Sequence, residues 1–136
     1  MKEPLMNYKG EDLYLIIANY IDNGRLYMGL ENEEGENYCD ITINLSDVPE
    51  IGDMAVFVNG DISSELKKEL RNIGLISKPI QQMPYNYGLY DIVIVNREAL
   101  KDYDKEEYQK FEEYYKSKNG VIEKEDKETE IEDIER

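Results

Sequence analysis

The sequence predicts a small α+β domain, in which an antiparallel sheet of about five strands carries two packed helices. Short segments of alternating apolar and polar residues lie between turn signals and predict strands, while two later segments have the apolar spacing of amphipathic helices. Apolar residues make up 40% of the 136-residue chain, which suffices for one hydrophobic core. We therefore expect one domain over residues 1–118 and an acidic tail over residues 119–136, which is mobile or extends the last helix.

An antiparallel meander of three strands is expected in the N-terminal half, after an irregular lead-in over residues 1–10. Its strands are expected at residues 12–20, 25–31 and 36–45. Asn23 and Gly24 join the first two strands, because an Asn-Gly pair accepts the positive φ angles of a tight hairpin turn. The alternation in the third strand predicts one solvent-facing side, made of Tyr38, Asp40, Thr42 and Asn44.

The next segment is expected to form a loop, a short buried strand and a helix. The loop covers residues 46–53, the strand covers residues 54–58, and Asp61 is expected to cap the helix. One face of this helix is apolar and consists of Ile62, Leu66, Leu70 and Ile73.

The last part of the domain is expected to be a loop, a strand and a second helix. Residues 75–88 contain two prolines and predict the loop, and the apolar residues 89–95 predict a strand in the middle of the sheet. Asn96 can cap a short turn, and Asp104 opens the helix. The helix would dock on the sheet through Tyr108, Phe111 and Tyr115.

Charge is the most unusual property of the chain, because 31 acidic residues face 16 basic ones and give a net charge of −15. Between Arg25 and Lys67 lie ten carboxylates and no basic residue. Such a surface repels nucleic acid and anionic membranes, and it attracts a basic protein. We therefore expect neither direct nucleic-acid binding nor membrane binding.

The residue types argue against an enzyme and against a bound metal or cofactor. Histidine is absent, and no nucleophile motif, glycine-rich phosphate loop or calcium-loop pattern occurs. The single cysteine, Cys39, cannot form a disulfide within the chain, which fits a reducing compartment. No signal peptide or membrane-spanning segment is evident, so we expect a cytoplasmic protein.

The acidic run is the main candidate for a binding surface. Carboxylates on one face of a sheet stand at spacings close to those of backbone phosphates, so the face could imitate nucleic acid and occupy a basic groove. The candidate partner-binding carboxylates are Glu31, Glu33, Glu34, Glu36, Asp40, Asp47, Glu50 and Asp53. Tyr38 and Tyr85 are the candidate contact anchors, since tyrosine is favoured in interfaces.

Three other interpretations remain open. A pocket at a homodimer interface could sequester a cyclic nucleotide signal by stacking on tyrosine and pairing with arginine. Its candidate residues are Tyr87, Tyr90, Arg25 and Arg97. Alternatively, the acidic tail could make the chain a protein–protein adaptor. The carboxylates could also form an ordinary solvated surface.

Several short motifs resemble a known family. They are residues 22–27 (DNGRLY), 33–36 (EEGE), 42–45 (TINL), 87–91 (YGLYD) and 100–104 (LKDYD). Over residues 12–105 the chain resembles domain-of-unknown-function family 4313, which phages and mobile elements of Firmicutes and related gut bacteria carry. The family has no catalytic residues to transfer, and its glycine-rich aromatic loop is replaced here by residues 81–86 (QQMPYN). The resemblance implies a non-enzymatic inhibitor of bacterial immunity, of anti-CRISPR or anti-restriction type, in the host cytoplasm.

Overall fold

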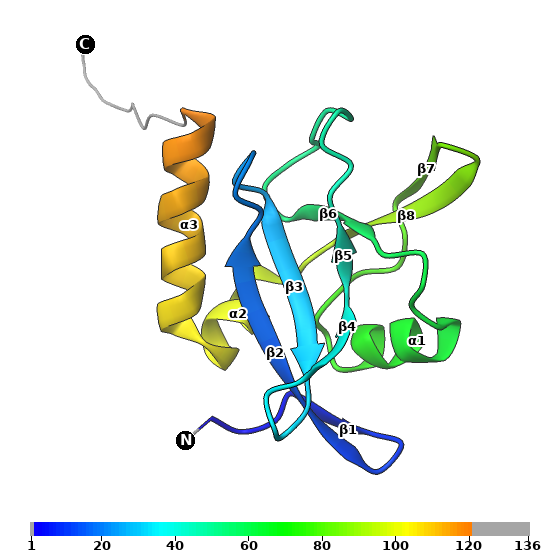
Figure 1. Ribbon diagram of the computed structural model, residues 1–136, viewed down its shortest axis with the longest axis vertical. Coiled ribbons are helices and arrows are strands. Elements are labelled where there is room, and N and C mark those ends of the chain that lie inside the picture. The colour runs from blue at the N-terminus through cyan, green and yellow to red at the C-terminus, as the bar shows by residue number, and fades with distance from the viewer. Residues whose placement is uncertain (1, 121–136) are drawn as a thin grey trace.

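A computed structural model describes residues 2–120, and two four-stranded antiparallel sheets lie at its centre (Figure 1). The strand order is β1-β2-β3-β4 in the first sheet and β5-β6-β8-β7 in the second. The strands are β1 Met6–Tyr8, β2 Glu11–Asn19, β3 Leu26–Glu31, β4 Asn37–Asp40, β5 Thr42–Ile43, β6 Ala55–Val58, β7 Gln81–Tyr85 and β8 Gly88–Ile94. Three helices complete this part of the chain: α1 Ser64–Asn72, α2 Arg97–Tyr103 and α3 Lys105–Asn119. The α+β class and the β2-β3-β4 meander are therefore confirmed.

Strands β4 and β5 belong to one extended segment, which passes from the first sheet to the second at Ile41. The Ile41 N–H donates to the carbonyl of Met28, and the Ile41 carbonyl accepts from the N–H of Asn59. The neighbouring Thr42 is only 2% exposed, and its hydroxyl accepts from the Met28 N–H and bonds the Tyr20 hydroxyl. Thr42 was expected to face solvent, and this expectation is wrong because the change of sheet turns its side chain inward.

The main hydrophobic core lies between the two sheets and the three helices. In the first sheet Leu15 pairs with Leu30 and Ile17 pairs with Met28, and all four side chains are buried. This is the inward face that the alternating pattern of β2 and β3 predicts. The second sheet and α1 close the core through Val56, Val58, Val93, Val95, Leu66 and Leu70.

Helices α2 and α3 cover the part of the β2 edge that β1 leaves open (Figure 1). The Tyr103 hydroxyl accepts from the N–H of Leu15, and the Asn19 amide donates to the carbonyl of Phe111. The first bond uses a backbone N–H that would otherwise stay unpaired at the edge of the sheet. The second ties the end of β2 to the middle of α3. Tyr108 and Phe111 are buried beside them, as the helical spacing predicts.

Two strands lie where the sequence predicts irregular chain. Strand β1 lies within residues 1–10 and pairs with β2, and β7 lies within residues 75–88 and pairs with β8. The single sheet of about five strands is therefore corrected to two sheets with eight strands over residues 2–120. Strand β8 has a neighbour on each side, which confirms its central position.

The capping residue predicted for the N-terminus is correct in two of the three described helices. Asn96 caps α2 and Asp104 caps α3, as expected, and α2 is a helix of its own rather than a turn. The expected cap of α1 is wrong, because Ser63 accepts from the Leu66 N–H whereas Asp61 lies in a turn set by Asn59.

Within residues 2–120, no helix combines the length and the apolar character that crossing a bilayer requires. The expected acidic tail, apart from its first two residues, lies outside the described residues.

The Asp104 side chain should make a pH-dependent contribution to stability. Burial raises its pKa, but hydrogen bonds from Lys2 and from the Glu107 N–H outweigh burial, so the pKa of Asp104 lies below its ordinary value. A lowered carboxyl pKa stabilises the fold above about pH 4, and this contribution is lost as the pH falls.

We expect Asp104→Ala to lower the free energy of unfolding by about 1 kcal/mol at neutral pH, because the helix loses its cap. Asp104→Asn keeps a capping oxygen, so it should lose only the stabilisation that comes from the negative charge of the carboxylate. In urea unfolding, the difference between the wild type and Asp104→Asn should shrink as the pH falls from about 6 to about 3. A difference that does not change with pH would contradict the assignment.

Candidate acidic interface

The acidic run between Arg25 and Lys67 is divided between two ends of the molecule. Residues 31–36 form the β3–β4 turn, and residues 46–53 form the loop between β5 and β6. The extended segment that joins them can span up to about 30 Å at 3.3 Å per residue. In Figure 1 the turn lies at the lower end and the loop lies at the upper end. The single acidic face expected from the sequence is therefore not formed.

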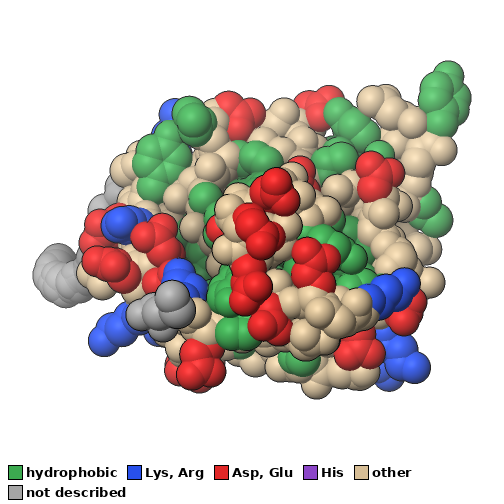
Figure 2. Space-filling view, turned by 60° about the horizontal axis from the view of Figure 1, so that its bottom comes forward, with side chains coloured by type: hydrophobic (Ala, Val, Ile, Leu, Met, Phe, Trp, Pro, Cys, Tyr) green, Lys and Arg blue, Asp and Glu red, His purple; other side chains and the backbone are tan. Residues whose placement is uncertain are grey.

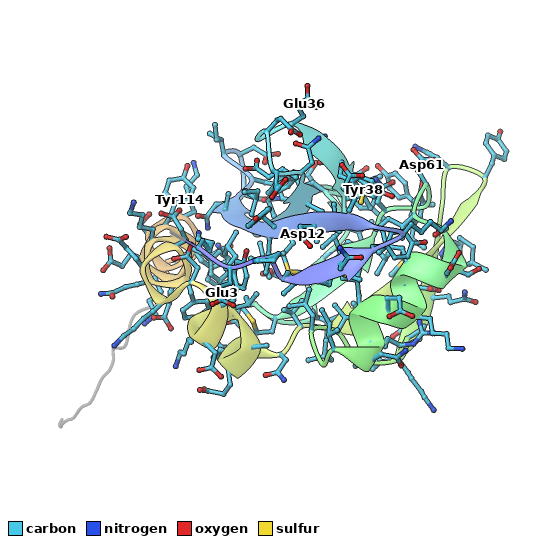
Figure 3. All side chains as sticks on the ribbon, turned by 90° about the horizontal axis from the view of Figure 1, so that it is seen from below. Glu3, Asp12, Glu36, Tyr38, Asp61 and Tyr114 are labelled. Carbon is cyan, nitrogen blue, oxygen red and sulfur yellow. The ribbon has the colours of Figure 1, made fainter. Side chains whose placement is uncertain are left out.

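At the lower end, the β1–β2 hairpin adds two carboxylates that sequence reasoning did not include. Glu11 and Asp12 line the same shallow hollow as Glu33 and Glu34, with a cavity volume of about 250 Å³. We call this region the acidic end, and it consists of Glu11, Asp12, Glu31, Glu33, Glu34 and Glu36. Figure 2 is turned so that this end comes forward, and it shows acidic side chains gathered there. Figure 3 views the molecule from the same end and shows Asp12 and Glu36.

The β3–β4 turn is fixed by the side chain of Asn32. Its amide oxygen accepts from the N–H groups of Glu34 and Glu36, and its amide nitrogen donates to the Glu36 carboxylate. The backbone N–H of Asn32 also donates to the carbonyl of Glu36. An asparagine at this place thus closes the turn locally, as Asx turns do, and leaves the side chains of Glu33 and Glu34 exposed.

The six carboxylates of the acidic end take part in none of the salt bridges found among residues 2–120. Asp12 accepts from the Asn7 amide, which is a neutral donor. In contrast, the nearby Lys9 pairs with Glu65 and Lys2 pairs with Asp104. Lys2, which lines a hollow beside the acidic end, and Lys9 therefore pair with carboxylates outside the acidic end.

A second hollow adjoins the acidic end and has an aromatic wall. Its cavity volume is about 610 Å³, and its lining includes Tyr14, Ile16, Glu31 and the β3–β4 turn. Burial raises the pKa of Tyr14, and the carboxylates of Glu33 and Asp12 raise it further. The Tyr14 ring thus lies within the negative field of the acidic end.

Asp40 and Tyr38 lie on β4, next to the acidic end. The Tyr27 hydroxyl donates to the Asp40 carboxylate at 2.7 Å, and its ring crosses Gly29, where an added Cβ would lie 2.2 Å from the Tyr27 oxygen. Gly29 therefore allows this tyrosine to lie flat on the sheet. Tyr38 remains exposed and makes an edge contact with Tyr8 (Figure 3). Asp40 thus has a structural partner, whereas Tyr38 is accessible for contact.

The other predicted carboxylates anchor the loop at the upper end. Asp47 accepts from the Tyr85 hydroxyl at 2.6 Å, and Asp53 accepts from the Arg97 guanidinium at 2.8 and 3.0 Å. Tyr85 comes from β7 and Arg97 from α2, so different elements hold the same loop. Tyr85 was expected to be a contact anchor, and its hydroxyl instead fixes Asp47.

Glu50 and the loop backbone are held in the same way. The Tyr115 hydroxyl donates to Glu50 at 2.6 Å, and the Arg25 guanidinium donates to the carbonyls of Leu45 and Val48 at 3.0 and 2.7 Å. Burial and the Glu50 carboxylate raise the pKa of Tyr115, so it remains a protonated donor. These three carboxylates of the loop therefore stabilise the fold.

The residues of the nucleotide interpretation do not form one pocket. Arg25 and Arg97 both hold the loop at residues 46–53, whereas Tyr87 lies at the tip of the β7–β8 hairpin. Tyr90 packs edge-on against Tyr85 with ring centroids 6.5 Å apart. Neither arginine is thus available to pair with a phosphate unless a loop contact is given up.

No group of three Cys, Asp or Glu side chains within residues 2–120 is arranged to hold a metal ion. Burial raises the pKa of the Cys39 thiol to about 11, which keeps it protonated and unreactive at neutral pH.

Comparison with known proteins finds no matching family model, no matching curated protein and no matching solved structure. The family resemblance drawn from the short motifs therefore stays a prediction.

Removing the Tyr115 hydroxyl should loosen the loop at residues 46–53. Tyr115→Phe leaves the Glu50 carboxylate without its donor, and we expect a loss of about 1 kcal/mol in the free energy of unfolding. Amide hydrogen exchange should speed up in this loop and stay unchanged in the β3–β4 turn. Tyr114→Phe is the matched control, because the Tyr114 hydroxyl bonds the Ile21 carbonyl instead. Equal effects of both variants on the loop would contradict the anchoring role.

Proposed function

We propose that the chain is a non-enzymatic inhibitor that binds the basic groove of a nucleic-acid-binding protein with its acidic end. The observation that carries this proposal is the group of six carboxylates without a salt bridge among the described residues. The motif resemblance extends the proposal to bacterial defence proteins, such as a CRISPR effector or a restriction enzyme. The groove would then be occupied by protein in place of nucleic acid.

Retaining unpaired like charges at one end is unfavourable for the isolated fold. Carboxylates at neighbouring turns repel one another, and this repulsion weakens the compact state. A partner that brings lysine and arginine side chains relieves this repulsion on binding. It also gains the attraction that phosphate groups normally provide in its groove. The carboxylates of the acidic end therefore repel one another in the free protein and are attracted to basic side chains in the complex.

The shape of the acidic end supports a groove rather than a flat partner. Two turns, β1–β2 and β3–β4, project from the same end of the molecule and place carboxylates at or beside their tips (Figure 1). The bonds made by Asn32 fix the second turn before binding, so little conformational entropy is lost there. Tyr38 lies beside the carboxylates and supplies an exposed aromatic contact.

Neutralising the β3–β4 turn should weaken partner binding without unfolding the protein. The variant replaces three exposed carboxylates by amides: Glu33→Gln, Glu34→Gln and Glu36→Gln. Its matched control makes the same change of net charge on α2 and α3: Glu98→Gln, Glu106→Gln and Glu113→Gln.

The measurement is retention of bacterial lysate proteins on the immobilised full-length chain, eluted with increasing salt and, separately, with duplex DNA. We expect wild-type chain and the control to retain a protein that duplex DNA displaces, and the turn variant to release it at lower salt. The proposal fails if both variants retain it equally, or if DNA displaces nothing.

A further inference from the structure

The outward face of β2 is apolar, although an antiparallel strand that borders solvent usually carries polar side chains there. Tyr14, Ile16 and Ala18 alternate with the three buried side chains of the strand, so they lie on the face turned away from the core. Residues 13–21 carry no charge, although charged residues make up 35% of the sequence. The three outward side chains are partly exposed, and they pack against neither buried cluster of the described residues. A hydrophobic core therefore does not account for them.

The neighbouring strand β3 confines the charge of this face to one end. Opposite Tyr14, Ile16 and Ala18 lie, in this order, Glu31, Gly29 and Tyr27. Glu31 belongs to the acidic end, whereas Gly29 has no side chain and is covered by the Tyr27 ring. The paired part of β2 and β3 thus presents an apolar and aromatic surface that becomes negative towards the β3–β4 turn. Exposed apolar surface of this kind marks interaction sites.

Two hollows follow one another along this face of β2. The first is the hollow with the aromatic wall, of about 610 Å³, and its lining includes Ile16. The second has a volume of about 270 Å³, and Ala18, Ile21 and Tyr114 are among its lining residues. Side chains two residues apart in a strand are separated by about 7 Å, so the two hollows adjoin. Their arrangement fits an elongated occupant.

Helix α3 and the β3–β4 turn flank this face on its two sides. In Figure 3, Tyr114 of α3 and Glu36 of the turn project to the same side of the molecule, opposite α1 and α2. The α3 residues Glu107 and Lys110 border the second hollow and pair with each other at 3.1 Å. The second hollow is therefore neutral on balance.

The first hollow is negative. Lys2 lines it, but its ammonium group pairs with Asp104. The lining also contains three carboxylates of the acidic end that form no salt bridge within the described part of the chain: Glu31, Glu33 and Glu34. A complementary occupant therefore carries positive charge at the first hollow and apolar side chains along the rest of its length.

We propose that the two hollows bind one extended segment of the partner, which places an arginine side chain on Tyr14 and apolar side chains on Ile16 and Ala18. A guanidinium group can stack on the tyrosine ring and pair with a carboxylate at the same time, whereas the ammonium of lysine lacks this planar geometry. The identity of the partner rests on the proposed function. The affinity of the hollows for such a segment does not, and it can be measured without the partner.

Charge argues against the two occupants that the chain itself could supply. Residues 121–136 contain eight acidic and three basic residues, so the carboxylates of the first hollow repel them. A second copy of the chain brings a net charge of −15. A basic segment of a different protein therefore fits the hollows best.

The first arm of the test uses the full-length chain and a synthetic peptide. The blocked pentapeptide Arg-Ser-Leu-Ser-Val places its arginine, leucine and valine on one face at the spacing of the three outward β2 side chains. In an NMR titration we expect saturable shifts of the amides of residues 14–18 and 31–35. The peptide Glu-Ser-Leu-Ser-Val should bind at least tenfold more weakly. Absence of saturable shifts at residues 14–18, or equal binding of both peptides, would overturn the inference.

A variant of Tyr14 tests the stacking of the guanidinium. Tyr14→Leu keeps an apolar wall but removes the ring, so it should reduce the preference for the arginine peptide over its lysine counterpart at least threefold. Tyr87→Leu is the matched control, because Tyr87 is fully exposed on the β7–β8 hairpin, away from both hollows. An unchanged preference in Tyr14→Leu would overturn the placement of arginine on this ring.

The second arm uses the protein retained in the lysate experiment as the probe. Ile16→Thr should weaken its binding at least fivefold without changing the salt dependence, because no charge is altered. Ile94→Thr is the matched control, since it makes the same substitution at a residue of β8 that is 39% exposed. The thermal midpoints of both variants confirm that they fold. Equal effects of the two substitutions would contradict the proposed contact.

The two proposals can fail separately. If the peptide binds at residues 14–18 but the chain retains no lysate protein, the proposed function fails and the assignment of the hollows stands. If DNA displaces a retained protein that Ile16→Thr holds as tightly as wild type, the inference fails and the proposed function stands. Shifts confined to residues 31–36 would indicate a site for a small cation only. A tenfold gain in peptide affinity on removal of residues 121–136 would show that this segment occupies the hollows, and either result would overturn the inference.

Discussion

Ile41 is the residue on which the arrangement of the two sheets depends. Its N–H bonds the first sheet, its carbonyl bonds the N–H that follows β6, and its side chain is fully buried between them. One residue thus joins both hydrogen-bond ladders and fills the core at their junction. Because one residue makes both bonds, the two sheets cannot slide relative to each other without breaking at least one of them. The positions of the turns at its two ends follow from this constraint.

The same segment explains how the molecule separates two kinds of acidic residue. Carboxylates before the segment lie at the acidic end, and those after it lie in the loop at residues 46–53. Helix α2, helix α3 and β7 reach the loop and supply donors to it, whereas the lysines near the acidic end pair elsewhere. Carboxylates of the same run therefore have different surroundings at the two ends. Those of the loop accept hydrogen bonds that hold it, whereas those of the acidic end form no salt bridge within residues 2–120.

Local patterns in the sequence predicted the elements that depend on local physics. The alternation in β2 and β3 and the caps of α2 and α3 are present. A β2–β3 hairpin is also present, but its loop covers residues 21–24 rather than a tight Asn-Gly turn, and only Gly24 has a positive φ angle. Strand β7 was missed because its glutamines and proline show no alternation, and pairing with β8 makes it a strand. Its Asn86-Tyr87 turn also lacks the glycine that signals a hairpin.

The candidate site was harder to predict, because the partners of its carboxylates are distant in sequence. Glu50 is 65 residues from Tyr115, and Asp53 is 44 residues from Arg97. No local pattern reveals such contacts. One signal was present nevertheless: a strand over residues 36–45 must carry its two ends far apart. Strand length alone thus argues against one continuous acidic face.

The use of tyrosine connects the charge of the molecule with its stability. Three carboxylates accept from phenol groups: Asp40 from Tyr27, Asp47 from Tyr85 and Glu50 from Tyr115. A lysine in each place would fix the carboxylate equally well but would cancel its charge. A phenol fixes it and leaves the charge in place, and the raised pKa values of all three tyrosines keep the donors protonated above neutral pH. The chain, with its 12 tyrosines, thereby orders its acidic residues while preserving the negative field that would attract a basic partner.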